Sequence, residues 1–138
     1  MLFRSRWRTE ILNGMSNERR PRVLMVMEAT IGGTKRHLHE VSVGLRARGW
    51  PVEVACPRVR AEAHGDTSFW DDLEAAGVPL HAIPMERKIA SWVNLHAIRA
   101  LARMIREASP RIDIVHAHSA IGGAVARLAV LEIGRAHV

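Results

Sequence analysis

The order of apolar and polar residues along the chain predicts alternating strands and helices. Four short runs are rich in apolar and β-branched residues, as is typical of strands in a parallel sheet. Apolar residues at helical spacing lie between and after these runs. The predicted strands span residues 22–28, 51–57, 78–84 and 111–118, and the predicted helices span residues 34–48, 68–76, 91–107 and 120–131.

Two of the predicted helices have informative details. The first begins at Thr34, a favourable N-cap residue, and ends before Gly49, a favourable residue just past a helix end. The last helix carries an apolar stripe that we expect to face the sheet: Ile121, Val125, Leu128 and Leu131.

Strands joined by helices predict βαβ units with right-handed crossovers. The natural arrangement is an α/β fold with a doubly wound, Rossmann-like parallel sheet in the order 3-2-1-4. The first and fourth strands are then neighbours at the topological switch point, where ligands bind outside the carboxyl ends of the strands. The sequences that follow these strands are IGGT, residues 31–34, and HAHS, residues 116–119. The topology therefore brings a Gly-Gly turn and a His-x-His pair together.

The Gly-Gly turn is a candidate phosphate site. Glycine lets backbone N–H groups approach a ligand closely, and the start of a helix favours an anion. A phosphate at Gly32, Gly33 and Thr34 is one interpretation, and a simple tight turn is the other. The segment has neither the G-x-G-x-x-G pattern nor the G-x-x-x-x-G-K-[ST] pattern, which argues against dinucleotide binding and P-loop hydrolysis.

The side chains of His116 and His118 point to the same side of an extended strand. Three interpretations are open: a metal pair, strand-end histidines bonded to backbone, and imidazoles that bond a sugar or phosphate. Further metal ligands are not evident, because Cys56 stands alone and no H-E-x-x-H occurs. We therefore predict no metal site.

Composition narrows the picture further. The 138 residues suit one domain, and the single cysteine fits a reducing compartment. The net charge is +6, and residues 1–22 contribute six Arg and two Glu, or +4 of it. We expect residues 1–21 to form a basic, disordered leader. Nucleic acid, an anionic membrane surface or plain solvation could each explain its charge.

Three segments resemble the family-4 glycosyltransferases, which have the GT-B fold. GGTKRHLHEVSVGLRARGWPVEVACP, residues 32–57, is similar to the family's first βαβ unit, and GVPLHAIPMER, residues 77–87, to a later segment. DIVHAHSAIGGAVARLAV, residues 113–130, is similar to its fourth strand and the following helix. The resemblance covers about residues 22–131, the N-terminal, acceptor-side Rossmann-like domain. GGTKRHL together with HAHS most resembles members that act in exopolysaccharide or other cell-envelope glycan synthesis.

The resemblance implies a metal-independent, retaining transfer of a sugar from a nucleotide-diphosphate donor to a hydroxyl of a glycan or lipid-linked acceptor, with no cofactor. It implies that Gly32 and Gly33 lie against the donor diphosphate and that His118 acts beside the transferred sugar. Secondary candidates for acceptor or phosphate contacts are Arg36, His37, Arg87, His116 and Ser119.

The expected partners are the nucleotide sugar, the acceptor and the inner membrane surface, with no nucleic acid. The expected location is the cytoplasm, at the membrane face. Residues 132–138, EIGRAHV, resemble a translated sequencing-library adapter, so we expect a non-native tail. The chain is then the truncated N-terminal part of a GT-B enzyme and inactive alone.

Two other classes stay open. One is a non-catalytic Rossmann-like module that binds a nucleotide or sugar. The other is a flavodoxin-like or response-regulator-like fold, which would need several acidic residues after the first strand, where only Glu28 lies.

Overall fold

Strands and helices alternate along the chain, as the apolar pattern predicts. The computed structural model describes residues 19–30, 32–59 and 65–134. Its elements are β1 (Val23–Met27), α2 (Gly33–Ala47), β2 (Val52–Cys56), α3 (Ser68–Ala75), β3 (Leu80–Ala82), α4 (Trp92–Glu107), β4 (Ile114–His118) and α5 (Ala120–Glu132). All four strands are parallel and lie in the order β3-β2-β1-β4, which confirms the predicted doubly wound sheet.

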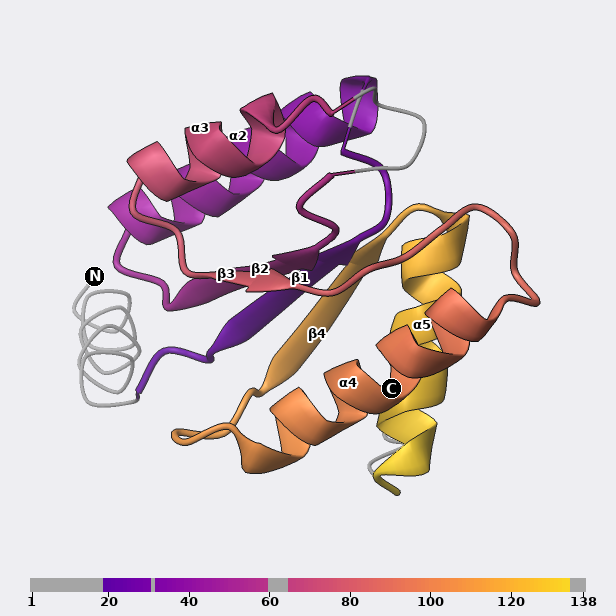
Figure 1. Ribbon diagram of the computed structural model, residues 1–138. Helices are drawn as coiled ribbons and strands as arrows, with labels where there is room; N and C mark the ends of the chain where they lie inside the picture. The colour runs from indigo at the N-terminus through magenta and orange to yellow at the C-terminus, as the bar shows by residue number, and fades with distance from the viewer. Residues whose placement is uncertain (1–18, 31, 60–64, 135–138) are drawn as a thin grey trace, which may run out of the picture.

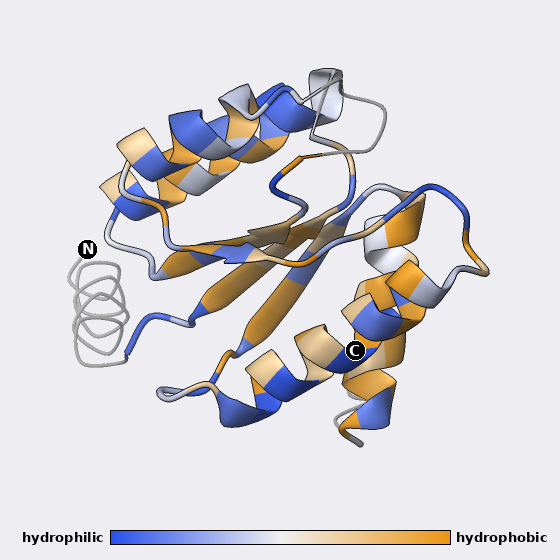
Figure 2. Cartoon of the chain, viewed as in Figure 1, coloured by the Kyte–Doolittle hydropathy of each residue, from blue (hydrophilic) through white to orange (hydrophobic). Residues whose placement is uncertain are grey.

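The sheet is the middle of three layers. Helices α2 and α3 cover one face, and α4 and α5 cover the other (Figure 1). Each face buries its own apolar cluster, one around Met25 and Leu38 and the other around Leu24 and Leu101. The strands are mostly apolar, although β2, β3 and β4 also carry Glu53 and three histidines, while the helices turn polar residues outward (Figure 2). Burial of each large apolar side chain contributes about 1.5–3 kcal/mol, so both clusters hold the sheet between its helices.

The fourth strand differs from the buried strand that its apolar residues predict. β4 lies at the edge of the sheet, and one of its faces is open: Ile114 is 43% exposed and His116 is exposed as well. The other face, with Val115 and Ala117, packs on the cluster beneath α4 and α5. The reason is that α2 packs mainly over β2, so it leaves Ile114 and His116 of β4 uncovered on that side.

The start of α2 and the buried face of α5 also differ from the prediction. Thr34 is not the N-cap, because the turn occurs earlier, at Gly32, and the helix begins at Gly33. In α5, Leu128 and Leu131 are 49% and 57% exposed. Ile121 and Val125 are buried as predicted, and the other buried residues are three small ones, which allow the helix to lie close to its neighbours: Gly122, Ala126 and Ala129.

The chain ends lie mostly outside the described residues. Of the predicted leader, only residues 19–21 are described, and of the predicted tail only residues 132–134. Arg19 makes a two-pronged hydrogen bond to Asp113, at 2.8 and 3.0 Å. The start of the described chain is thereby tied to the segment that leads into β4.

Candidate functional site

Three histidines meet near the carboxyl end of β4. His118 lies opposite Met27 in the register of β1 and β4. Its ring stacks on that of His116, with centroids 4.4 Å apart, and meets the ring of His37 edge-on at 5.6 Å. Because His37 belongs to α2, the contact joins the helix that follows the Gly-Gly turn to the strand that carries His-x-His.

Burial favours the neutral form of the His118 imidazole. Its Nε2 atom is buried and has no hydrogen-bond partner among the described residues. Burial lowers the pKa of His118 below its ordinary value, and the neighbouring His116 and His37 lower it further by charge repulsion. A buried polar atom without a partner is unusual in a native fold and calls for an explanation. A ligand hydroxyl or oxygen beside Nε2 would supply the missing hydrogen bond.

The first turn of α2 is open to an anion. Gly32 has φ 85° and ψ −165°, a conformation that only glycine adopts easily, and no side chain caps the helix. The first turn has no acidic residue to offset its N–H groups. Apart from its chain neighbours and its own helix backbone, a Cβ built on Gly33 would meet none of the described residues within 4 Å, so there is open space beside it. This turn therefore combines free backbone donors with room for a ligand.

The start of α5 is held in a strained turn. Ser119 has φ 69°, which is uncommon for a residue other than glycine, and its Oγ accepts a hydrogen bond from the Gly122 N–H at 3.1 Å. A Cβ on Gly122 would lie 3.2 Å from the carbonyl oxygen of Val26 and 3.3 Å from the Cα of Met27. Gly122 thus lets α5 lie against β1, a role that its place in the quoted motif did not reveal.

A cavity of about 440 Å³ lies between the loops at this edge of the sheet. Glu28 and Ala29 line it from the end of β1, Arg87 and Ile89 from the loop before α4, and residues 119–121 from the start of α5. Two predicted candidates, Arg87 and Ser119, therefore share one cavity. Glu28 and Ile89 were not predicted as lining residues, since no pattern in the sequence links loops so far apart.

The remaining candidates lie outside this cavity. The Gly-Gly turn and His118 are not among its lining residues, so the candidates form two groups, one in the cavity and one around His118. Arg36 is exposed and pairs along its own helix with Glu40, at 2.8 Å. Thr34 lies in the first turn of α2, and its side chain has no hydrogen bond among the described contacts.

Several other chemistries find little support in the described residues. Cys56 is buried, and burial raises the pKa of its thiol to about 12, so it is no nucleophile at neutral pH. Within the described ranges, no group of three or more His, Cys, Asp or Glu is arranged to hold a metal ion. None of the described helices has the length and hydropathy needed to cross a membrane.

Comparison with known proteins identifies a family for this chain. A family model described as "Glycosyl transferase 4-like domain" matches residues 32–138, beginning at the Gly-Gly turn. No curated protein and no solved structure matches the chain significantly.

Proposed function

The chain belongs to the glycosyl transferase 4-like domain family, and from this premise we propose that it forms the acceptor-side domain of a retaining glycosyltransferase. A sugar donor and an acceptor are the substrates that this family implies. The proposed donor is a nucleotide-diphosphate sugar, and the proposed acceptor is a hydroxyl of a glycan or lipid-linked glycan in the cell envelope. No cofactor or resident metal takes part in the proposed reaction.

One observation carries the proposal: α2, whose first turn has no side-chain cap, contacts His118 through His37, and the buried Nε2 of His118 has no hydrogen-bond partner among the described residues. When the bond between sugar and diphosphate breaks, negative charge develops on the leaving diphosphate. Backbone N–H groups at Gly33 and Thr34, together with the positive end of the helix dipole, would stabilise that charge. A neutral His118 would hydrogen-bond the sugar without placing another positive charge beside it.

The cavity is the proposed place for the acceptor. Its walls combine the cation Arg87, the carboxyl side chain of Glu28 and the apolar side chain of Ile89. This mixture suits a glycan that carries hydroxyl groups and an apolar or anionic portion. We propose that the reaction takes place on the cytoplasmic side of the membrane, where nucleotide sugars are made.

The test is a transfer assay with the full-length protein that carries this domain. A panel of nucleotide-diphosphate sugars is combined with envelope glycan and lipid-linked acceptors, and NMR reads the anomeric configuration of the product. Transfer with retention of configuration supports the proposal, and inversion contradicts its mechanism. Saturable binding of a nucleotide sugar without turnover would indicate the non-catalytic binding module instead. The same assay on residues 1–138 tests the expectation that this part alone transfers no sugar.

A further inference from the structure

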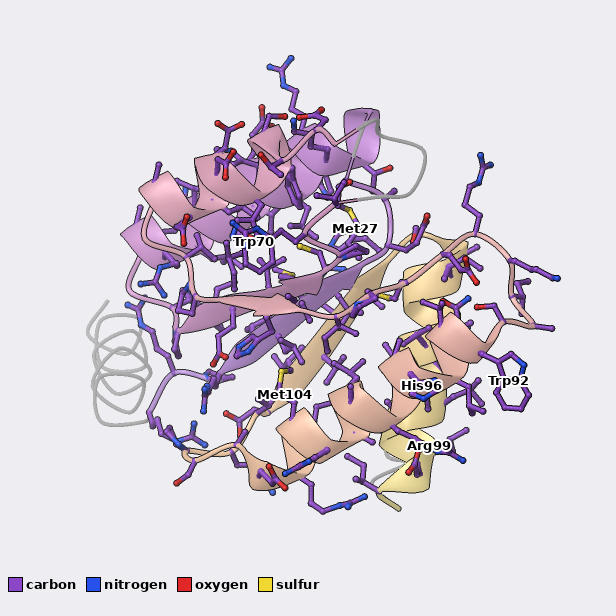
Figure 3. All side chains as sticks on the ribbon, viewed as in Figure 1. Met27, Trp70, Trp92, His96, Arg99 and Met104 are labelled. Carbon is purple, nitrogen blue, oxygen red and sulfur yellow. The ribbon has the colours of Figure 1, made fainter. Side chains whose placement is uncertain are left out.

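The beginning of α4 exposes an unusual concentration of apolar side chains. Seven large apolar residues are exposed among the described residues, and three of them lie within residues 89–93. Ile89 is 73% exposed, Trp92 is 77% exposed and Val93 is 38% exposed. We call these three residues the apolar tip. In Figure 3, Trp92 points away from the body of the domain.

The exposure of the apolar tip is built into the fold. Asn94 is buried, and its side-chain oxygen accepts a hydrogen bond from the Glu86 N–H at 3.0 Å. Its side-chain nitrogen donates to the carbonyl oxygens of Glu86 and Lys88, at 2.9 and 2.8 Å. Ser91 caps α4 by accepting a hydrogen bond from the Asn94 N–H at 3.1 Å. These bonds fix the loop on both sides of Ile89. The apolar side chains are therefore held outward and are not the result of a frayed helix end.

Cations continue the same surface along α4. Trp92, His96, Arg99 and Arg103 follow one another at helical spacing, and all four are exposed. Figure 3 shows His96 and Arg99 farther along the helix from Trp92. The segment from residue 87 to residue 106 contains no Asp or Glu and has five cations: Arg87, Lys88, Arg99, Arg103 and Arg106. One of them, Arg103, pairs with Glu107 at 3.0 Å.

We propose that the apolar tip inserts into the headgroup region of an anionic lipid bilayer and that the cations of α4 bind lipid phosphates. Tryptophan is enriched at membrane–water interfaces, and long cationic side chains reach the headgroups from an apolar base. Each Lys or Arg near an anionic surface adds about 1 kcal/mol of attraction. An apolar protein partner would account for Ile89 and Trp92 but not for the five cations of residues 87–106, a segment that contains no Asp or Glu.

The docking would present the cavity to the membrane. Ile89 belongs both to the apolar tip and to the wall of the cavity, beside Arg87. A lipid-linked acceptor could then enter the cavity from the bilayer without leaving it. This step rests on the proposed function, whereas insertion of the tip does not depend on it.

The experiment measures quenching of tryptophan fluorescence in the full-length protein by brominated lipids. Vesicles contain either phosphatidylcholine alone or phosphatidylcholine with 30% phosphatidylglycerol. We expect quenching only with the anionic vesicles and its loss in Trp92→Phe. The comparison with Trp92→Phe is needed because the Arg-rich residues 1–22 also contain a tryptophan, Trp7, and their charge attracts anionic vesicles.

Co-sedimentation with the same vesicles gives the affinity. Ile89→Ser with Trp92→Ser should lower the partition coefficient about tenfold or more. The matched control is Leu131→Ser, which removes a 57% exposed apolar side chain from α5 and should leave the partition unchanged. Circular dichroism checks that each variant is folded.

Three results would overturn the proposal: equal quenching in Trp92→Phe, equal partition of the double variant, or equal binding to neutral vesicles. A dimer in gel filtration that the double variant abolishes, without vesicle binding, would identify a second copy of the chain as the occupant. Vesicle insertion without sugar transfer would leave the docking standing and contradict the proposed function. Transfer to a water-soluble acceptor without insertion would contradict the docking and leave sugar transfer as the function.

Discussion

The two edges of the sheet differ in how their polar side chains are hydrogen-bonded. At the amino edge, Asp113 accepts hydrogen bonds from the Arg19 guanidinium and from the Arg22 N–H, all at 2.8–3.0 Å. Glu53 is buried there between the side chains of Arg22 and His81. At the carboxyl edge, Thr30 and His118 each have a buried polar atom without a hydrogen-bond partner among the described residues.

The pKa values follow the same division. Burial by itself raises the pKa of Glu53, but hydrogen bonds from Arg22 and His81 outweigh it, so the pKa is lowered. The Arg19 hydrogen bond lowers the pKa of Asp113 to about 2. For His118, burial and like charges act together, and both disfavour the charged form. A buried polar group without a partner costs about 1–3 kcal/mol. We infer that the amino edge holds the fold together, while the carboxyl edge keeps groups free for a ligand.

Of the changes considered, removal of the His118 imidazole at the carboxyl edge should have the largest effect. It should lower the catalytic rate and leave the stability of the fold nearly unchanged. In the full-length protein, we expect His118→Ala to lower turnover by about 10²–10³, or about 2.7–4 kcal/mol, because one hydrogen bond in the transition state is lost. Steady-state kinetics measure the turnover, and a thermal melt should show little change. His39→Ala, in the same helix as His37, is the control. Unchanged turnover in His118→Ala would remove this residue from the catalytic group.

A change at the amino edge should instead cost stability. Arg22→Met leaves Glu53 buried with His81 as its remaining side-chain partner. We expect a loss of about 1.5–3 kcal/mol in the free energy of unfolding, the range for a hydrogen bond to a charged group. Urea denaturation measures it.

The control for this prediction is Arg36→Met. Arg36 and Glu40 form an ion pair whose side chains are 84% and 60% exposed, and solvent screening leaves exposed pairs of this kind with little effect on stability. Equal losses in Arg22→Met and Arg36→Met would show that the amino edge has no special role.

The Gly-Gly turn allows a smaller, more selective change. Gly33→Val meets no neighbouring atom, so the fold should persist. The branched side chain would fill the space proposed for the diphosphate, and we expect the Kd for the donor to rise at least about tenfold, or about 1.4 kcal/mol. Isothermal titration calorimetry measures the Kd. Ala47→Val, at the other end of α2, should leave it unchanged; an unaltered Kd in Gly33→Val would mean that the turn is only structural.

The smallest expected effect is on the pH dependence of stability. The folded-state pKa of His118 lies below its ordinary value of 6.5, so the unfolded chain binds more protons below about pH 6.5. Above that pH the imidazole is neutral in both the folded and the unfolded chain, so the pKa shift costs no stability. As pH drops below about 6.5, protonation favours the unfolded chain, and the free energy of unfolding falls. Asp113 contributes stability above its ordinary pKa of 3.8, and this is lost as pH falls to about 2.

Urea denaturation from pH 8 to pH 5 separates the two edges. We expect His118→Gln to flatten the fall in stability between pH 6.5 and 5. Arg19→Ala should instead lower stability by the same amount across the whole range from pH 8 to pH 5 and leave the slope between pH 6.5 and 5 unchanged. An identical slope in His118→Gln and the wild type would contradict the pKa shift of His118.

The sequence predicts the topology well because local signals set it. The run Val23–Met27 is buried at every position, and Gly49 and Gly77 end their helices with φ of 79° and 72°, as expected. The face of α5 could not be predicted in this way. Leu128 and Leu131 fit a helical stripe, but the contact between Gly122 and β1 sets which side is buried. Such a contact depends on tertiary packing and leaves no periodic trace.

For the candidate site too, one part follows from local signals in the sequence and another depends on tertiary packing. Strand order alone brings the helix after the Gly-Gly turn to the His-x-His strand, and the contact between His37 and His118 agrees with it. The cavity depends on the path of the loop that carries Arg87 and Ile89. Loop paths follow from bonds such as those of Asn94 to the backbone, which hydrophobic periodicity does not encode.

Hydrogen exchange in the full-length protein, with and without nucleotide diphosphates, tests the central claim most directly. If the carboxyl edge is kept for a ligand, ADP, GDP or UDP should slow exchange of the amides in residues 32–38 and 116–123. The amino edge, residues 19–23 and 110–114, should exchange at the same rate in both states. Protection at the amino edge, or no protection at the carboxyl edge with any of the three nucleotides, would contradict the account.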